Sequence, residues 1–341
     1  MSSLQSRIAR RARISQSTVS RALNNHPALP RATCKRIQQI ARQLGYVPNP
    51  LVSSVFSAMR RRQNRMSLGT LAFLSAHPTL DGWKKVATYR DFFLGAQARA
   101  IKQGFGLETH WAMEPGITGP RLGAILQARG IGGVIVSSRG SKEDFPELPW
   151  DKFALVRLGV SQMKLPFHCV VNHQFNTARL VAGELAARGY ARIGLAVTAW
   201  QNEVVDQGWL GGFLVWQQSQ PAARRVPAKI FPELFEETFM DWFRRHRPDA
   251  IIAVNPDVID VLRAAKYRVP EDVGAALLDW HDNYGDIAGA DQNNQMVGSK
   301  AVDILLSQLH RNERGIPDHP YRMLIESSWR DGATVRPPRK P

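Results

Sequence analysis

Candidate ligand-contacting side chains follow several apolar runs that are typical of buried strands. Ligands in open α/β folds bind outside the carboxyl ends of the strands. Hydroxyl, imidazole, guanidinium, amide and carboxylate groups there can hydrogen-bond a small polar molecule, and an indole can stack on a sugar ring. The candidate ligand contacts selected by this rule are Ser75, His77, Arg139, Asn172, His173, Asn255, Asp279 and Trp280.

The same side chains do not form a recognisable catalytic motif. The sequence has no Gly-x-x-x-x-Gly-Lys phosphate loop, no Gly-x-Gly-x-x-Gly, no Gly-x-Ser-x-Gly elbow and no paired Cys or His at metal-ligand spacing. Isolated histidines such as His168 and His281 are usually surface or capping residues. We therefore expect no enzymatic activity, cofactor or metal, and an α/β enzyme with a regulatory head is the less favoured alternative.

A second set of polar side chains lies near the N-terminus, on a predicted recognition helix. Ser15 is a good N-cap for a helix over 16–24, because its hydroxyl can accept from an orphan backbone N–H. The buried stripe of this helix has i, i+3, i+4 spacing and consists of Val19, Ala22 and Leu23. The opposite face presents donors and acceptors suited to base edges in a major groove. These are Gln16, Ser17, Ser20 and Arg21.

The charge of this region supports a nucleic-acid partner. The whole chain has 45 basic and 29 acidic residues. The first 65 positions contain 13 Lys or Arg and no Asp or Glu, and the first acid of the chain is Asp81. Ordinary surfaces mix both signs, so this asymmetry indicates a polyanion. RNA is an alternative, but duplex DNA is favoured because its major groove admits an α-helix and that of A-form RNA does not.

Two further helices and a short third segment complete the N-terminal region. Helices are expected over 5–11 and from Pro30 or Arg31 to Leu44, with Gly45 ending the latter. Asn49 can then cap a short amphipathic helix, too short to be stable alone in water. We expect it to fold only against its twin, DNA or both, and a plain linker is the alternative. Its apolar side would contain Leu51, Val52, Val55, Phe56 and Met59.

The remainder alternates expected strands with amphipathic helices, which predicts an α/β fold of mostly parallel sheets. The strands are expected at 68–75, 105–111, 132–138, 153–158, 192–198, 228–231, 250–254 and 274–279. The helices are expected at 89–103, 120–129, 174–188, 209–218, 233–246, 256–267 and 292–310. The length suits two doubly wound lobes. With two cysteines and no apolar run long enough to span a membrane, we expect a soluble, cytoplasmic protein.

The N-terminal segments resemble the DNA-binding head of the lac repressor (LacI/GalR) family of transcription regulators. The resemblance rests on Thr18-Val19-Ser20-Arg21 and on the run Gly45-Tyr46-Val47-Pro48-Asn49. It implies base contacts by Gln16, Ser17 and Arg21, and phosphate contacts by Ser15, Thr18, Ser20 and Asn24. It also implies that the hinge helix enters a minor groove through Asn49, Val55 and Phe56. Val55 stands where the family usually has Leu, and Arg13 where it usually has Gly at a position that can need positive φ.

The body is similar to the family's two-lobed, periplasmic-binding-protein-like core, through segments 185–194 and 291–302. This implies a helix-turn-helix domain at 1–47 and a hinge at 48–66. The N-terminal lobe would comprise 67–167 with about 295–325, and the C-terminal lobe 168–294 with about 326–341. The chain would cross between lobes near His168, Asn294 and Ile325. Trp209 stands where the family commonly has a sugar-binding Arg, so we include it among the candidate effector contacts.

Together these observations predict a homodimeric, sequence-specific DNA-binding regulator, expected to repress a catabolic operon. A small-molecule effector, expected to be a carbohydrate or related metabolite, would bind between the lobes and shift operator affinity through the hinge helices. Twofold symmetry would match a palindromic operator. The alternative is a DNA-binding regulator or architectural protein without a small-molecule effector.

Overall fold

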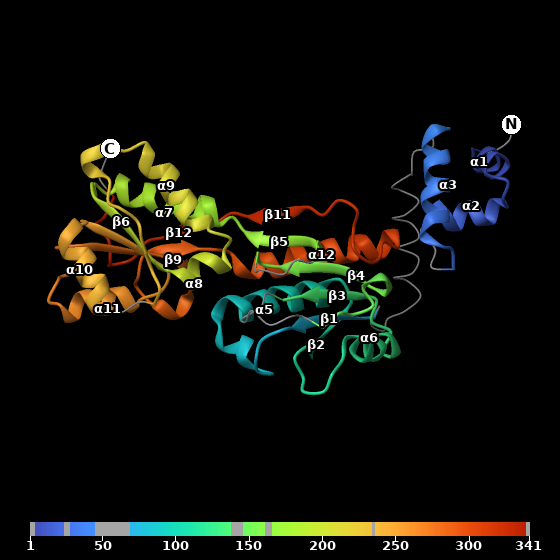
Figure 1. The fold of residues 1–341 in the computed structure, drawn as a ribbon, viewed down its shortest axis with the longest axis horizontal. Helices are drawn as coiled ribbons and strands as arrows, with labels where there is room; N and C mark the ends of the chain where they lie inside the picture. The colour runs from blue at the N-terminus through green and yellow to red at the C-terminus, as the bar shows by residue number, and fades with distance from the viewer. Residues whose placement is uncertain are drawn as a thin grey trace.

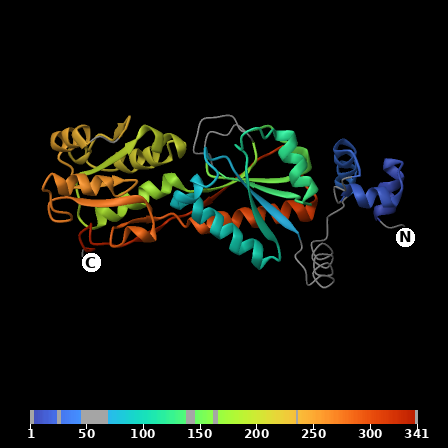
Figure 2. The ribbon, with the colours of Figure 1, turned by 90° about the horizontal axis from the view of Figure 1, so that it is seen from below.

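The computed structural model describes residues 4–23, 28–44, 69–137, 146–160, 166–233 and 236–338. Within these ranges a small helical head is followed by two α/β lobes arranged end to end, and the head lies beyond the outer end of the first lobe (Figures 1 and 2). The predicted hinge at 48–66, with Asn49, Val55 and Phe56, lies outside the described residues, as do Asn24, Gly45 and Arg139. No helix in the described ranges is long and apolar enough to cross a membrane.

The head contains α1 (Leu4–Ala12), α2 (Gln16–Leu23) and α3 (Arg31–Gln43). The backbone N–H of Thr18 donates to Ser15 Oγ at 3.1 Å, which confirms the predicted cap of α2. Arg13, in the turn before it, has φ of 53°, the positive value that the position was expected to need. The three helices share a small core formed by Ile8, Ala9, Ala12, Val19, Ala22, Cys34, Ile37 and Ala41.

The first lobe is built on a six-stranded, wholly parallel sheet in the order β11-β5-β4-β3-β1-β2. The strands are β1 (Thr70–Ser75), β2 (Gly106–Trp111), β3 (Gly133–Val136), β4 (Ala154–Leu158), β5 (His168–Asn172) and β11 (Arg322–Ile325). Alternate residues of β1 point to opposite faces, as a strand requires. Leu71 and Phe73 pack under α5 (Ala87–Lys102) and α12 (Asn294–Arg311), whereas Ala72 and Leu74 pack against α6 (Gly119–Ala128).

The second lobe repeats the plan with the order β12-β10-β9-β8-β6-β7. The strands are β6 (Ile193–Thr198), β7 (Lys229–Phe231), β8 (Ala250–Ala253), β9 (Gly274–Trp280), β10 (Gly289–Asp291) and β12 (Ser328–Arg330), the last antiparallel to β10. One face packs on α7 (Gln174–Ala187) and α9 (Gly208–Gln218), the other on α10 (Glu236–His246) and α11 (Asp257–Ala264). The expected α/β class with two mostly parallel sheets is confirmed.

The chain passes between the sheets three times. It leaves the first sheet after β5, returns between β10 and α12, and leaves again between β11 and β12. The first crossing therefore follows Asn172; His168, where we had expected it, is the first residue of β5. Side-chain amides join the crossings: Asn172 Nδ2 donates to the carbonyl of Gln292 at 2.8 Å, and Asn293 Nδ2 to that of Glu326 at 2.8 Å.

Two glycines allow α5 and α12 to pack backbone against backbone in the first lobe. A Cβ at Gly298 would lie 1.9 Å from the carbonyl oxygen of Phe92, and one at Gly95 would lie 1.8 Å from that of Gln295. Real Cβ atoms do not approach so closely, so any larger residue would push the two helices apart. The first lobe therefore depends on α12, which the chain reaches only after most of the second lobe and which is followed only by β11 and β12 among the described elements.

Candidate DNA-reading face and inter-lobe site

The structure leaves the three predicted base-reading side chains of α2 on the surface. Gln16, Ser17 and Arg21 are all exposed, while Val19 and Ala22 of the same helix are buried. The 3.6-residue period of the sequence fixes this division, because it leaves only one face of α2 against α1 and α3. An exposed, acid-free recognition helix can enter the major groove of a duplex.

The residues predicted to contact phosphate flank this face. Ser15 is exposed, and its hydroxyl is hydrogen-bonded to those of Ser17 and Thr18, each at 2.8 Å. Thr18 and Ser20 are half-buried at the edges of the helix. The three hydroxyls at Ser15, Ser17 and Thr18 thus form one connected group at the N-terminus of α2, where the helix dipole favours an anion.

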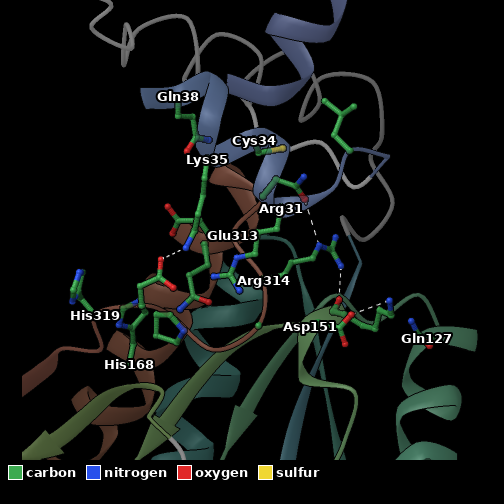
Figure 3. Close-up of a pocket in the computed structure, with 17 residues that line it drawn as sticks. Arg31, Cys34, Lys35, Gln38, Gln127, Asp151, His168, Glu313, Arg314 and His319 are labelled. Atoms are coloured by element: carbon green, nitrogen blue, oxygen red, sulfur yellow. Dashed lines mark hydrogen bonds and ion pairs between the residues drawn. The ribbon is translucent and has the colours of Figure 1, made fainter. Parts of the chain in front are cut away.

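The head contacts the first lobe through α3 and the loop that follows α12 (Figure 3). The guanidinium of Arg31 donates to the carbonyl oxygen of Ile316 at 3.2 Å, and Lys35 forms an ion pair with Asp318. A cavity of about 590 Å³ lies at this junction, and its lining mixes acids with bases. No residue of α2 lines it, so the reading face stays clear of this contact.

In the first lobe, two candidate effector contacts follow β1. Ser75 is 2% exposed, and its hydroxyl accepts a hydrogen bond from the backbone N–H of His77 at 3.3 Å. His77 Nδ1 accepts from the backbone N–H of Thr79 at 3.4 Å, and Trp111 Nε1 donates to the His77 carbonyl at 2.8 Å. Burial lowers the pKa of His77, which favours the neutral imidazole that accepts the hydrogen bond from Thr79.

In the second lobe, Asp279 and Trp280 end β9, and Asp279 contacts the first lobe. Asp279 Oδ2 accepts from Thr88 Oγ1 of α5 at 2.8 Å and lies 3.4 Å from His281 Nε2. This contact places the carboxyl end of β9 against the helix that follows β1, so the two strand-end edges face each other. The guanidinium of Arg330 lies 5.5 Å from the centre of one Trp280 ring.

Asn172 and His173 lie at the crossing after β5, not at an open strand end. Both amide hydrogen bonds of Asn172 are made within the crossing, to Gln292 and to Asn294 Oδ1 at 3.0 Å. His173 Nδ1 lies 2.6 Å from Glu326 Oε1 on the third crossing. Asn255 follows β8 and is half-buried. The structure therefore brings Asp279 to the lobe interface, leaves Trp280 beside Arg330 of the second lobe, and engages Asn172 and His173 in the crossings.

Trp209 lies near the N-terminus of α9 and packs into the core of the second lobe. It is 4% exposed, among Phe213, Val181 and Leu278 of one apolar cluster. So little of the indole face is accessible that stacking on a ligand would require a rearrangement. Its Nε1 is buried without a hydrogen-bond partner among the described residues.

Some of the buried polar atoms without partners lie at or shortly after the carboxyl ends of strands in both lobes. Within the described ranges this set includes Ser137 Oγ after β3, Asn202 Oδ1 shortly after β6, and Asp279 Oδ1 and Trp280 Nε1 at the end of β9. Buried polar atoms normally have partners, and leaving one without costs about 1–3 kcal/mol. The set supplies both donors and acceptors, which a polyhydroxyl compound could satisfy.

Sequence reasoning missed five residues of this region. Ser137 follows β3, Asn202 lies on α8 (Ala199–Val204), and Thr88, Asp91 and His281 meet at the lobe interface. His281 was expected to be a surface or capping histidine, but it is only 7% exposed. The Asp279-x-His281 spacing at a strand end was the available signal. Thr88 and Asp91 gave none, because helix periodicity does not reveal which lobe a helix end will meet.

A helix-turn-helix head on a two-lobed α/β core is the architecture of a DNA-binding regulator. Residues 6–49 match the model of the bacterial regulatory proteins of the lacI family, so the head is a lacI-family helix-turn-helix domain, as the resemblance predicted. The match ends at Asn49 and therefore concerns the head. A comparison with curated proteins found no match.

Solved structures share the fold of the whole chain. The transcriptional regulator CelR in complex with cellobiose is 19% identical with a TM-score of 0.58, covering 98% of this chain and all of that one. The lac repressor dimer bound to operator and the anti-inducer ONPF is 18% identical with a TM-score of 0.55, covering 97% and 98%. A LacI family regulator from Enterococcus faecium with bound ribose is 15% identical with a TM-score of 0.56, covering 80% and 100%. At these identities the likeness concerns the fold.

Proposed function

We propose that this protein is a homodimeric repressor whose operator affinity is controlled by a carbohydrate or related metabolite bound between the two lobes. The observation that carries the proposal is the set of unpartnered buried polar atoms near strand ends, defined above, together with the contact of Asp279 with the first lobe. Solved relatives of the same fold hold cellobiose and ribose, which supports the ligand class. A DNA-binding regulator with no small-molecule effector is the second candidate, and the absence of any stabilising ligand would favour it.

The proposed mechanism is linkage between lobe arrangement and DNA binding. An effector that binds one arrangement of the lobes more tightly must shift the population of that arrangement. The three crossings are joined by amide hydrogen bonds, and we expect the lobes to move as bodies around them. We infer that this movement changes the spacing of the two heads and therefore the fit to a palindromic operator.

Asp279 is expected to be an effector contact, and its substitution tests the site. A thermal-shift panel of sugars should find a compound that stabilises the protein by about 2.7 kcal/mol at a concentration of 100 Kd. Asp279→Asn should weaken the affinity for that compound about 10- to 100-fold, since a hydrogen bond to a charged group contributes about 1.5–3 kcal/mol. Asp241→Asn, on the exposed face of α10, is the matched control.

The outcome separates the candidates. An unchanged affinity in Asp279→Asn would place the ligand elsewhere. If no sugar stabilises the protein, the effector-free candidate is favoured, and sequencing of DNA fragments selected by the purified protein would then show which genes it controls.

Val55 is expected to be the wedge that the hinge helix inserts into a minor groove. Val55→Ser should weaken operator binding about 10-fold or more and binding to random DNA much less, because only the specific complex opens a base step. Arg62→Gln is the contrast: it should weaken both DNAs similarly and reduce the salt slope by about 1, as the loss of one phosphate contact does. Equal losses on both DNAs in Val55→Ser would show that the hinge is only a tether.

A further inference from the structure

Four polar side chains form a cross-lobe cluster between the N-terminus of α5 and the end of β9. They are Thr88 and Asp91 of the first lobe, and Asp279 and His281 of the second. His281 Nδ1 lies 3.6 Å from Asp91 Oδ2, and its Nε2 lies 3.4 Å from Asp279 Oδ2. Thr88 Oγ1 donates to Asp279 Oδ2 at 2.8 Å and lies 3.5 Å from His281 Nε2. One imidazole is thus placed between carboxylates that belong to different lobes.

The cluster is largely shielded from water. The His281 side chain is 7% exposed, and those of Asp91 and Asp279 are 22% and 18% exposed. With neutral His281, two carboxylates face each other across the lobe interface with no cation between them. With protonated His281, both carboxylates have a bridging cation, and charge pairs in such a setting are screened much less than at the surface.

We propose that this cluster is a proton-sensitive latch: protonated His281 holds the two lobes together, and its deprotonation releases them. Opening the lobes would separate Asp91 and Thr88 from His281, while Asp279 would stay beside it on the second lobe. The closed arrangement therefore binds the His281 proton more tightly than the open arrangement. The latch does not depend on which effector the protein binds.

The neighbouring charges agree with this direction. Burial acts to lower the pKa of His281, but the hydrogen bond with Asp279 and the charges of Asp279 and Asp91 outweigh it, so its pKa is raised. Arg90, also on α5, opposes this effect on the pKa of His281. In the turn after β9, the Tyr284 ring packs against His281, and the charge of Asp282 acts to raise the pKa of Asp91. Burial raises the pKa of Asp91, with His281 and Arg90 acting against that shift.

The sign of the pH dependence follows from the raised pKa. A group whose pKa is higher in the closed arrangement than in the open one favours closure below its open-state pKa, and that contribution is lost as pH rises through its closed-state pKa. One proton changes the ratio of open to closed molecules by at most about 10-fold per pH unit. The window begins at the pKa that His281 has in the open arrangement, where Asp279 still lies beside it, and extends upward to the higher pKa of the closed arrangement.

Spin labels on the full-length protein, without DNA or sugar, test the latch directly. Lys85→Cys and Asp260→Cys place labels on exposed sites of the two lobes, whereas the native Cys34 and Cys169 are buried. Double electron–electron resonance from about pH 6 to 8.5 should show a longer-distance population that grows with pH. His281→Gln should abolish this pH dependence, and the exposed His319→Gln should retain it.

Two variants of the first lobe keep the test decisive if His281→Gln does not fold. Asp91→Asn should flatten the pH dependence, because it removes the carboxylate that only the closed arrangement supplies. Thr88→Val should enlarge the open population at every pH and leave the pH dependence in place. The proposal would be overturned if the distances in the parent protein did not change with pH. It would also be overturned if the distances in His281→Gln and Asp91→Asn changed with pH in the same way as in the parent protein. Because neither operator nor sugar is present, this failure is distinguishable from failure of the proposed function.

Discussion

Arg21→Ala is expected to reduce the discrimination between operator and random DNA by about 5- to 150-fold, which corresponds to the 1–3 kcal/mol of one good base contact. Arg21 is exposed on the reading face of α2, and a guanidinium can contact both acceptors of a guanine at once. Binding to random DNA should fall much less, because only phosphate attraction operates there. Titrations of both DNAs at a fixed salt concentration measure the difference.

Arg42→Ala is the matched control for this experiment. Arg42 is exposed on α3, outside the predicted reading face, and carries the same charge. Its loss should affect operator and random DNA by similar factors. If Arg21→Ala also weakened both equally, Arg21 would contact phosphate, and base reading would rest on Gln16 and Ser17.

Gly298→Ala is expected to lower the free energy of unfolding by about 1–3 kcal/mol or more, the range found when a packed interior is overfilled. Elsewhere in a helix the same substitution stabilises by up to about 1 kcal/mol. The sign reverses here because the added Cβ would lie 1.9 Å from the Phe92 carbonyl oxygen, a backbone atom that cannot rotate away. Urea unfolding followed by circular dichroism measures the change.

Gly183 provides the opposite case within the same chain. It lies in α7, and a Cβ there would meet no atom within 4 Å. Gly183→Ala should therefore raise the free energy of unfolding. Similar effects of the two alanines would mean that α5 and α12 can separate at little cost, and that the close approach is not essential to the first lobe.

The sequence was informative where short-range patterns decide the structure. The Ser15 cap and the stripe of Val19 and Ala22 defined α2, and the apolar runs defined most central strands. It failed where a distant partner decides. β12 has only three residues, half-buried at most. It forms because the third crossing returns the chain to the second sheet, where Trp329 pairs with Ala290 of β10.

The candidate effector site shows the same division. The strand-end rule identified Asp279, which does contact the other lobe, but it also selected Asn172 and His173, which the crossings engage. No local pattern distinguishes the two groups, since the difference arises from where the chain leaves each sheet. The contact between Thr88 and Asp279 joins residues 191 positions apart and required the three-dimensional structure.

The place of α12 in the first lobe has a consequence for synthesis on the ribosome. About 190 residues, including most of the second lobe, separate the end of α5 from the start of α12. At about 5–20 residues per second, the apolar face of α5 waits roughly 10–40 s for its partner helix. The helical head has its own core and can fold at once. The nascent chain thus carries a folded DNA-binding head well before it can complete the lobe that is proposed to regulate it.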